Sequence, residues 1–318
     1  MKSIVIYFSQ TGNTRQIAGA IQTGVSESNG KCDIARIQDV GNEDLQKYDL
    51  IGLGSPVWLR REPANVLGFI EYNLKSLEGK HAFTFCTHGL YPGHFIGRVV
   101  PALRLEGLTV VGWKSWYCSV WLPEHPKPYF TDGHPDEIDL QEAQDFGREM
   151  AARSRRLYDG ETDLIPDLPV GREYHELYPG PGSTDRAGRR SSPEGALDMI
   201  DLRSFDLKIN RERCNYPQCT VCIDNCPTGS INFSLSPPLF RQNCDRCFFC
   251  EQICPRGAIE VDWKPLADFV EKNVIDNWVT VAEEAVASGR LRRLVPPEEI
   301  GLKTSWYTVE KPPRLKPL

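Results

Sequence analysis

Eight cysteines crowd into residues 214–254, in two sets that follow nearly the same spacing. One set reads Cys-x2-Cys-x2-Cys-x3-Cys-Pro from Cys244 to Pro255, and an earlier one reads Cys-x4-Cys-x2-Cys-x3-Cys-Pro from Cys214 to Pro227. Only three of the eleven cysteines in this chain of 318 residues lie elsewhere. Such crowding differs from the disulfide framework of a secreted domain, so the pattern predicts a metal-binding module.

The spacing has a direct geometric consequence. Gaps of two residues let one tight loop direct three thiolates at a single metal group, and the three-residue step with its proline turns the fourth thiolate toward a neighbouring group. Matching segments, PTGSINF and PRGAIEV, follow the two sets, and each reads as a turn leading into a short apolar strand. We therefore expect an internal twofold repeat.

This run of cysteines resembles that of bacterial two-cluster ferredoxins, in which the fourth cysteine of each set ligates the other [4Fe–4S] cluster. The resemblance covers about 50 residues of the module and implies two ligand sets that exchange their last members. Cluster one would be held by Cys214, Cys219, Cys222 and Cys254, and cluster two by Cys244, Cys247, Cys250 and Cys226.

Zinc is the alternative metal, because two Cys-x2-Cys hooks supply the four thiolates of a zinc ribbon. Four cysteines in each half, each half closing on Cys-Pro, favour iron–sulfur clusters instead. The gap of four residues after Cys214 departs from the usual two, so the loop there must bulge. Whether Cys214 is a ligand is left open by the sequence.

Residues 1–158 alternate between strand-like and helix-like segments. Short apolar runs predict strands, while apolar residues at helical spacing, or a proline at the start of a segment, predict the helices between them. Five near-continuously apolar strands separated by helices predict a doubly wound parallel sheet covered on both faces. The expected strands are 3–8, 32–37, 48–54, 81–86 and 109–118, and the expected helices are 13–28, 63–77, 94–106 and 135–158.

The segment SQTGNT joins the first expected strand to the first helix. Such a junction directs backbone N–H groups and the positive end of a helix dipole at one point, which suits an anion. The glycine permits close approach, and no Gly-Lys-Ser/Thr follows as a nucleotide-triphosphate loop would require. The candidate anion-binding residues are Ser9, Gln10, Thr11, Gly12, Asn13 and Thr14.

The same segment resembles the phosphate loop of flavodoxins, which hold the phosphate of FMN with neutral donors. Two later segments, 54–63 and 87–93, follow the third and fourth strands, at the sheet edge where such folds bind ligands. The resemblance covers residues 1–155 and implies that these loops bracket the flavin ring, with Trp58 stacking on it and Tyr91 as the second choice. The residues implied are Ser55, Pro56, Val57, Trp58, Thr87, His88, Gly89, Tyr91 and Gly93.

Each of these side chains also has a plainer interpretation. Trp58 would serve equally as a core aromatic, and Tyr91 as a packing residue of its loop. The His88 side chain is better interpreted as a hydrogen-bonding group that fixes its loop than as an acid catalyst. The resemblance also implies that backbone groups of Thr87, His88 and Gly89 contact the pyrimidine edge of the flavin ring. Cys86 and Cys118 read as buried packing residues, and no catalytic residue is assigned.

Composition excludes some functions. A formal net charge of −6 argues against a nucleic-acid partner, because phosphate binding requires a basic surface. The basic runs at 152–156, 187–190 and 290–293 read as solvated surface, with docking to an acidic redox partner as the alternative. No apolar run approaches the length of a membrane helix, and Met1 leads straight into an expected strand. We therefore expect a cytoplasmic protein without a membrane span.

Taken together, the sequence resembles a flavodoxin–ferredoxin fusion. It predicts an α/β flavodoxin-like domain over 1–158, a linker over 159–205, a small α+β two-cluster domain over 206–262 and a helical extension over 263–318. The resemblance implies an iron–sulfur flavoprotein of anaerobes that passes low-potential electrons between two [4Fe–4S] clusters and FMN for a redox partner protein, a ferredoxin or an oxidoreductase. The alternatives are an FMN-dependent reductase of a small molecule fed by its own clusters, and a regulatory redox sensor. A homodimer is left open.

Overall fold

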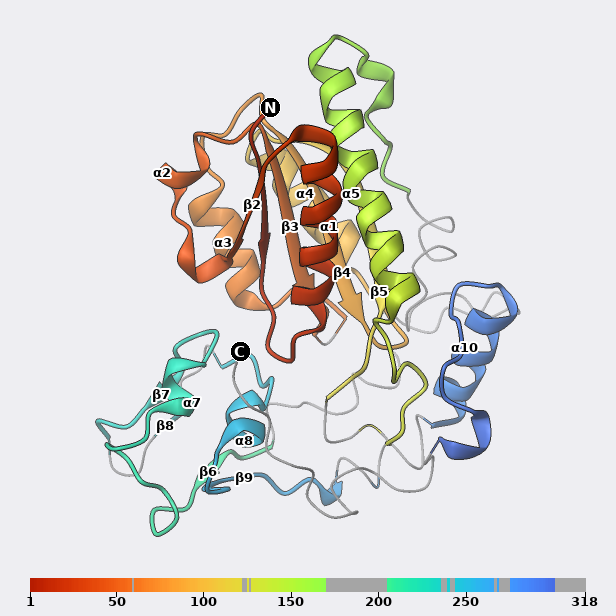
Figure 1. Cartoon of the computed structure of the whole chain (residues 1–318). Coiled ribbons are helices and arrows are strands. Elements are labelled where there is room, and N and C mark those ends of the chain that lie inside the picture. Colours follow the sequence, from red (N-terminus) through yellow and green to blue (C-terminus); the bar gives the residue numbers. More distant parts are fainter. Residues whose placement is uncertain are drawn as a thin grey trace. The chain divides into compact units, whose positions relative to one another are not determined.

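The structure is a computed structural model that describes residues 1–58, 60–121, 125, 127–169, 205–235, 239–240, 244–265, 268 and 275–300. The chain divides into two units (Figure 1). The first comprises Met1–Ser119 and Gly133–Arg190, and the second Val120–Asp132 and Ser191–Leu318. The segment 120–132 thus joins the second unit, although the sequence analysis placed it in the first domain. Most of the expected linker, from 170 to 204, lies outside the described residues.

Five parallel strands in the order β2-β1-β3-β4-β5 form the sheet of the first unit. Ser3 lies opposite both Cys32 and Leu50, and His81 lies opposite both Leu50 and Thr109. The carboxyl ends of all five strands therefore meet at one edge, and the predicted doubly wound sheet is confirmed. The strands are β1 (Ser3–Tyr7), β2 (Cys32–Arg36), β3 (Leu50–Pro56), β4 (His81–His88) and β5 (Thr109–Tyr117).

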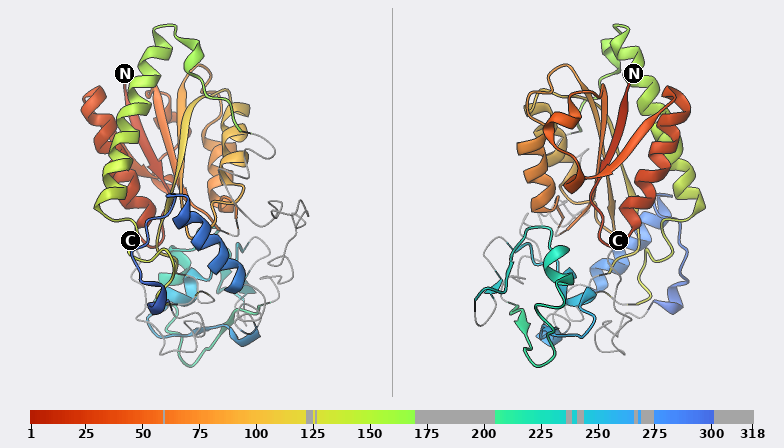
Figure 2. Two further views of the ribbon diagram at one scale, coloured as in Figure 1. Left: turned by 90° about the vertical axis from the view of Figure 1, so that its right-hand side faces the viewer. Right: turned by 60° about the vertical axis from the view of Figure 1, so that its left-hand side comes forward.

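Helices cover both faces of this sheet, with α1 and α5 on one side and α3 and α4 on the other (Figure 2). For this reason every residue of the inner strands β1 and β4 is buried, whereas in the edge strand β2 only Cys32 is buried and the residues after it alternate between half-buried and exposed positions. The short helix α2 was not predicted. The helices are α1 (Asn13–Asn29), α2 (Asn42–Leu45), α3 (Ala64–Asn73), α4 (Phe95–Leu105) and α5 (Glu137–Tyr158).

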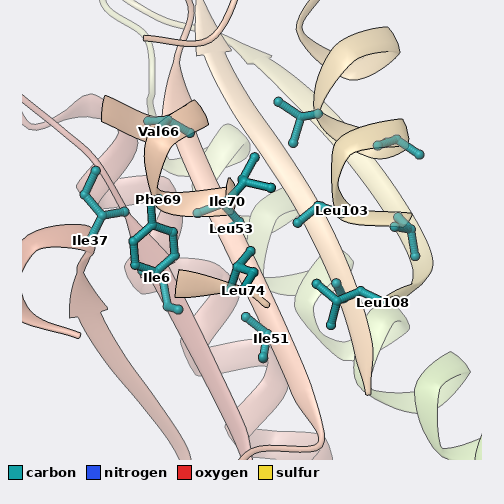
Figure 3. Close-up of a cluster of buried hydrophobic side chains, with 14 of the residues drawn as sticks. Ile6, Ile37, Ile51, Leu53, Val66, Phe69, Ile70, Leu74, Leu103 and Leu108 are labelled. Atoms are coloured by element: carbon teal, nitrogen blue, oxygen red, sulfur yellow. The ribbon is translucent and has the colours of Figure 1, made fainter. Parts of the chain in front are cut away.

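An apolar core fills the space between the sheet and helices α3 and α4 (Figure 3). Ile6 and Leu53 from the strands meet Phe69 and Ile70 from α3 there, and all four side chains are buried. Each such side chain contributes roughly 1.5–3 kcal/mol on transfer from water. Helix α3 ends earlier than expected, but residues in the turn after it remain in this core.

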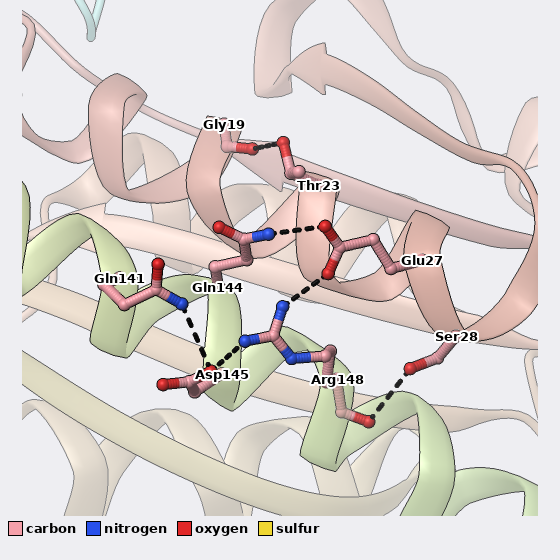
Figure 4. A network of polar contacts seen from close by, with 8 residues as sticks. All are labelled: Gly19, Thr23, Glu27, Ser28, Gln141, Gln144, Asp145 and Arg148. Carbon is pink, nitrogen blue, oxygen red and sulfur yellow. Dashed lines mark hydrogen bonds and ion pairs between the residues drawn. The ribbon is translucent and has the colours of Figure 1, made fainter.

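Helices α1 and α5 approach each other closely on the opposite face. A Cβ atom added at Gly24 would lie 1.9 Å from the carbonyl oxygen of Gln144, and one added at Gly147 would lie 2.3 Å from that of Ile21. Beside this contact Glu27 accepts hydrogen bonds from Gln144 and Arg148 (Figure 4). Exposed ion pairs of this kind contribute little to the free energy of folding. The two glycines, which leave room for the facing backbone, therefore determine how close the helices lie.

The second unit contains short elements around the cysteine module and one longer helix. His125 stacks on Trp278 of α10 with ring centroids 4.7 Å apart, and Tyr129 packs edge-on against the same indole. These rings hold segment 120–132 in this unit. Its elements are α7 (Val221–Asp224), α8 (Phe249–Ile253), α10 (Ile275–Ala287), β6 (Lys208–Ile209), β7 (Ile231–Asn232), β8 (Leu239–Phe240) and β9 (Ile259–Glu260). None of the helices described in either unit has the length and apolar character needed to cross a membrane.

The glycine contact between α1 and α5 predicts opposite effects of two substitutions in one helix. Gly24→Ala should lower the free energy of unfolding by about 1–3 kcal/mol, because the new methyl group meets the backbone of α5. Gly19→Ala should raise it by roughly 0.5–1 kcal/mol, because an added Cβ atom there meets nothing within 4 Å and alanine favours the helix. Urea unfolding measures the free energy of unfolding of both variants. Equal changes in this free energy would contradict the close contact between the helices.

Candidate functional site

The loop after β1 leaves the first turn of α1 open. Gly12 precedes the helix with φ 101°, and no side chain caps the helix N-terminus. The Gly12 N–H donates to Ser9 Oγ at 3.2 Å, which closes the loop on itself and leaves the proton of that hydroxyl for another acceptor. Thr11 is exposed, while Gln10 is half-buried. The loop therefore fits an anion bound by backbone N–H groups and neutral side chains.

Two hydrogen bonds fix this loop to neighbouring strands. The hydroxyls of Thr14 and Thr87 lie 2.8 Å apart, and the Asn13 side-chain amide donates to the carbonyl of Ser119 at 2.9 Å. Asn13, expected among the anion donors, thus uses a side-chain proton to bond the end of β5. The same contacts bring the expected anion loop and the start of segment 87–93 together, as the sequence analysis required.

The loop after β3 is a tight turn that carries Trp58. Backbone hydrogen bonds of 2.9 Å join Trp58 and Arg61 in both directions, and the Val57 N–H donates to the carbonyl of Thr87 at 2.9 Å. The indole is half-buried and packs edge-on against Phe8, with ring centroids 5.4 Å apart. Trp58 thus packs on the core and is also partly accessible. Ser55 is fully buried, and Pro56 and Val57 are half-buried.

Gly93 joins this turn to the loop after β4. It has φ 57°, and a Cβ atom built on it would lie 2.3 Å from the backbone oxygen of Arg60. The same oxygen accepts a hydrogen bond of 2.7 Å from the His94 N–H. Tyr91 is half-buried in this loop, and burial raises the pKa of its hydroxyl, so it remains protonated at neutral pH. The two loops expected to flank a flavin therefore form one connected rim.

An ion pair between a buried carboxylate and a half-exposed guanidinium, which the sequence analysis missed, anchors the rim. The Glu62 carboxylate is almost completely buried and accepts three hydrogen bonds of 2.8–2.9 Å from the Arg98 guanidinium of α4. Charge-assisted pairing of this geometry is strong and fixes orientation. In the sequence, the segment LRREP contains two arginines and one glutamate, and nothing in this pattern indicates which of the three charged side chains is buried.

His88 fixes the loop at the end of β4. Its Nδ1 lies 2.8 Å from the Gly89 carbonyl, and its own carbonyl accepts a bond of 2.7 Å from the Cys118 N–H. Burial lowers the pKa of the imidazole to about 4. At neutral pH the ring is therefore uncharged, with Nδ1–H as donor to Gly89, and the proton required of an acid catalyst is missing from Nε2.

In the second unit, the four cysteines of the expected first set line a single pocket. Phe233 and Arg256 line the same pocket. Burial, and after it the nearby thiols of this set, raise the pKa of Cys222 to about 12. This places Cys214 with the other members of its set, despite the longer gap that follows it. The set is Cys214, Cys219, Cys222 and Cys254.

The four cysteines of the expected second set are also neighbours. Burial raises the pKa of Cys250 well above its usual value, and the charges of Cys247, Cys244, Cys222 and Cys226 add to that rise. Cys226, which belongs to the first half in sequence, also raises the pKa of Cys244. Cys254 therefore lies in the pocket of the first half's cysteines, and Cys226 is close enough to Cys244 and Cys250 of the second half to raise their pKa.

The two halves repeat in detail. The Cys226 sulfur accepts a hydrogen bond from the Ser230 N–H, and the Cys254 sulfur accepts one from the Ala258 N–H, both at 3.2 Å. The glycines between them have the same φ of 57°. The helices α7 and α8 precede these turns, and the strands β7 and β9 follow them. The expected internal twofold repeat is thus visible in the backbone.

The longer gap after Cys214 is accommodated by aromatic packing. Tyr216, which lies inside the gap, stacks on Phe233 with ring centroids 4.6 Å apart and an interplanar angle of 26°. Phe233 in turn lines the pocket of the first cysteine set. The extra residues therefore bulge outward while Cys214 keeps its place in the pocket.

The donor set fits a metal cluster. All eleven cysteines are free of disulfides, and burial opposes ionisation of the crowded thiols. Several thiolates in one buried site repel one another, and metal cations remove that repulsion because the thiolate is the ligand form. Two sets of four thiols suit two [4Fe–4S] clusters, with backbone N–H groups already bonded to two of the sulfurs.

Gly93→Ala tests the connection between the two rim loops. Both Gly93 and Gly160 have positive φ, so alanine strains the backbone by about 1 kcal/mol or more at either position. Only at Gly93 does the new methyl group also meet backbone atoms, whereas an added Cβ atom at Gly160 meets nothing within 4 Å. Gly93→Ala should therefore lower the melting temperature clearly more than Gly160→Ala, and equal shifts would contradict the contact.

The burial of His88 predicts a pH dependence. Its pKa in the unfolded chain is about 6.5, so between pH 6.5 and about 4 the unfolded state binds a proton that the folded state excludes. Its contribution to stability is complete above pH 6.5 and falls by up to about 1.4 kcal/mol per pH unit below that. NMR titration of the His88 imidazole should give a midpoint near 4, and a midpoint near 6.5 would contradict its burial.

Comparisons with known proteins place the first unit. Residues 4–93 match the model of the flavodoxin domain family. An uncharacterized protein of Methanocaldococcus jannaschii is 27% identical over 164 residues, which are 47% of this chain and 98% of the relative. A flavodoxin of Clostridium beijerinckii is 25% identical over 149 residues, 46% of this chain and 97% of the relative.

A flavodoxin-like domain-containing protein of Clostridioides difficile, BilS, is 26% identical over 182 residues, which are 48% of this chain and 98% of the relative. Among solved structures, an archaeal flavodoxin is 24% identical, with a TM-score of 0.40, and the match covers 49% of this chain and 99% of that one. The family match, the curated flavodoxins and the observed strand order show that the N-terminal part of the chain is a flavodoxin-like domain.

Proposed function

We propose that this protein is an electron-transfer iron–sulfur flavoprotein. Its flavodoxin-like domain holds FMN, its cysteine module holds two [4Fe–4S] clusters, and electrons pass between these groups and a redox partner protein. The proposal is supported most by the position of Cys254 in the pocket of the first cysteine set, on a chain whose N-terminal part is a flavodoxin-like domain.

The FMN assignment rests on three loops at the carboxyl edge of the sheet. The open first turn of α1 and Gly12 suit the phosphate, and the Thr14–Thr87 contact holds that loop against the loop after β4. The turn carrying Trp58 and the loop around Gly93 form the rim that would flank the ring. Doubly wound sheets bind their ligands at this edge.

The residues of the rim position the site of the flavin ring and take no part in the chemistry themselves. Glu62 and Arg98 fix the Trp58 loop. His88 is neutral at neutral pH because burial lowers its pKa, and its ring is bonded to Gly89, so it is not placed to act as an acid. When bound, the clusters carry single electrons and the flavin exchanges one or two, so the chain joins one-electron and two-electron carriers. The chemistry assigned to the protein side chains is binding, orientation and electrostatics.

A partner protein is required, because an electron carrier must receive its electrons from another redox protein or pass them on to one. The chain has a formal net charge of −6, and each oxidised cluster with four thiolates adds about −2. In the described residues no observation favours the alternative, a reductase that acts on a small molecule. An electron carrier that serves another redox protein is therefore the function we propose.

Metal and flavin contents test the proposal with matched cysteine variants. Protein purified without oxygen should contain about eight irons and one FMN per chain. Cys214→Ala should lose about four irons, because it removes a ligand of the first set. Cys32→Ala, a buried cysteine at the start of β2, should keep all eight. Iron that is unchanged in Cys214→Ala would remove Cys214 from the ligands, and zinc in place of iron would refute the proposal.

The phosphate loop is tested independently of the metal. Thr14→Leu places a bulky apolar side chain at a buried position and removes the hydroxyl that contacts Thr87. FMN should be lost from this variant while iron stays at the wild-type level, because the cysteine module does not include this loop. Retention of FMN with wild-type affinity would show that the loop does not bind the phosphate.

A further inference from the structure

The chain leaves the first unit after β5 and returns to it before α5. The first unit stops at Ser119 and resumes at Gly133, while residues 120–132 belong to the second unit. Hydrogen bonds join the two ends. The Ser119 N–H and hydroxyl both donate to the His134 carbonyl, at 2.9 and 3.1 Å, and the Gly133 N–H donates to Ser119 Oγ at 3.2 Å. We call Ser119, Gly133 and His134 the neck.

Buried side chains attach the neck to the start of α5. The Nδ1 atom of the His134 ring lies 2.5 Å from Oδ2 of Asp139, and both residues are buried. The same carboxylate oxygen accepts a hydrogen bond of 2.9 Å from the Asp136 N–H, as part of the capping box that begins α5. The neck therefore has support of its own within the first unit.

The neck also holds the anion loop. The Ser119 carbonyl accepts a hydrogen bond of 2.9 Å from the Asn13 side-chain amide. Asn13 is the first residue of α1 and directly follows Gly12, so this bond ties the open first turn of the helix to the chain just after β5. A loop that is held in one conformation before its ligand arrives loses less conformational entropy on binding.

We propose that the neck positions the anion loop for the phosphate of FMN, and that Ser119, His134 and Asp139 are positioning residues for this ligand. Each residue acts through the next. Asp139 fixes His134, the His134 carbonyl fixes Ser119, and the Ser119 carbonyl fixes Asn13. The inference rests on the proposed function, because it requires the FMN site, and it adds residues that the loop sequence alone does not contain.

A second serine–histidine contact provides a comparison at the other end of the sheet. Ser154 Oγ lies 2.8 Å from Nδ1 of His81, and both residues are buried. His81 is the first residue of β4 and therefore lies at the amino end of the parallel strands, opposite the edge that carries the anion loop. Ser154→Ala thus removes a comparable hydrogen bond without reaching that loop.

FMN release tests the inference on the anaerobically purified full chain. Dilution, followed by the fluorescence of the released flavin, gives the dissociation constant of FMN. Asn13→Ala and Ser119→Ala should each raise this constant about five- to tenfold, the effect expected when about one net hydrogen bond is lost. Ser154→Ala should leave it unchanged. Weaker binding in Asn13→Ala but not in Ser119→Ala would overturn the role of the neck.

The double variant shows whether Ser119 acts through Asn13. If it does, Ser119→Ala has no further effect once Asn13 is alanine, so the double variant should bind FMN as weakly as Asn13→Ala alone. Additive losses would contradict the inference. Riboflavin, which lacks the phosphate, should bind wild type and Ser119→Ala about equally. The same loss of affinity for FMN and for riboflavin would indicate general damage to the site and would also contradict it.

Asp139 is tested by a pair of substitutions. Asp139→Ala removes the acceptor of the His134 ring and should weaken FMN binding, whereas Asp139→Asn keeps an oxygen acceptor and should retain most of the affinity. Equal losses in the two variants would refute the hydrogen-bonded role of Asp139. The Ser119 variants decide the question if Asp139→Ala does not fold.

The wild-type contents separate a failure of this inference from a failure of the proposed function. Wild type that contains FMN, with unchanged affinity in Ser119→Ala, would refute only the role of the neck and leave the electron carrier standing. Wild type that contains no FMN would refute both. Iron should stay at the wild-type level in every variant, because the cysteine module does not include the neck.

Discussion

The exchange of the fourth cysteine between the two halves is the constraint on which the second unit depends. Cys226 lies with the thiols of the second half, and Cys254 lies with those of the first. Because each site draws ligands from both halves, neither half completes a site alone. With both sites filled as proposed, metal binding would stabilise the whole module at once and compensate for the small apolar core that elements of two to five residues can form.

The first unit depends on a different constraint, the common direction of its strands. With all five strands parallel, the loops that follow β1, β3, β4 and β5 emerge at one edge. Short contacts then join them, including Thr14 with Thr87 and Gly93 with the Arg60 backbone. Close packing of α1 against α5 supports the opposite face of the sheet. The rim is thus built from loops, while its position is set by the sheet.

Local patterns in the sequence were sufficient to predict the sheet of the first unit. Apolar runs placed all five strands within two residues of their observed ends, because burial on both faces demands such runs. Contacts between residues far apart in the sequence could not be predicted. The sequence cannot show that Glu62 rather than a neighbouring residue is buried against Arg98, or that His125 stacks on Trp278 within the second unit. Such contacts depend on tertiary distances that no local pattern encodes.

EPR spectroscopy of the fully reduced protein tests the central claim most directly. Two [4Fe–4S] clusters whose ligand sets exchange a cysteine must lie close together, so their spins should interact and broaden each other's signals. The account predicts such coupled spectra, together with flavin absorbance in the oxidised protein. Spectra of a single isolated cluster, or a protein without an iron signal, would contradict it.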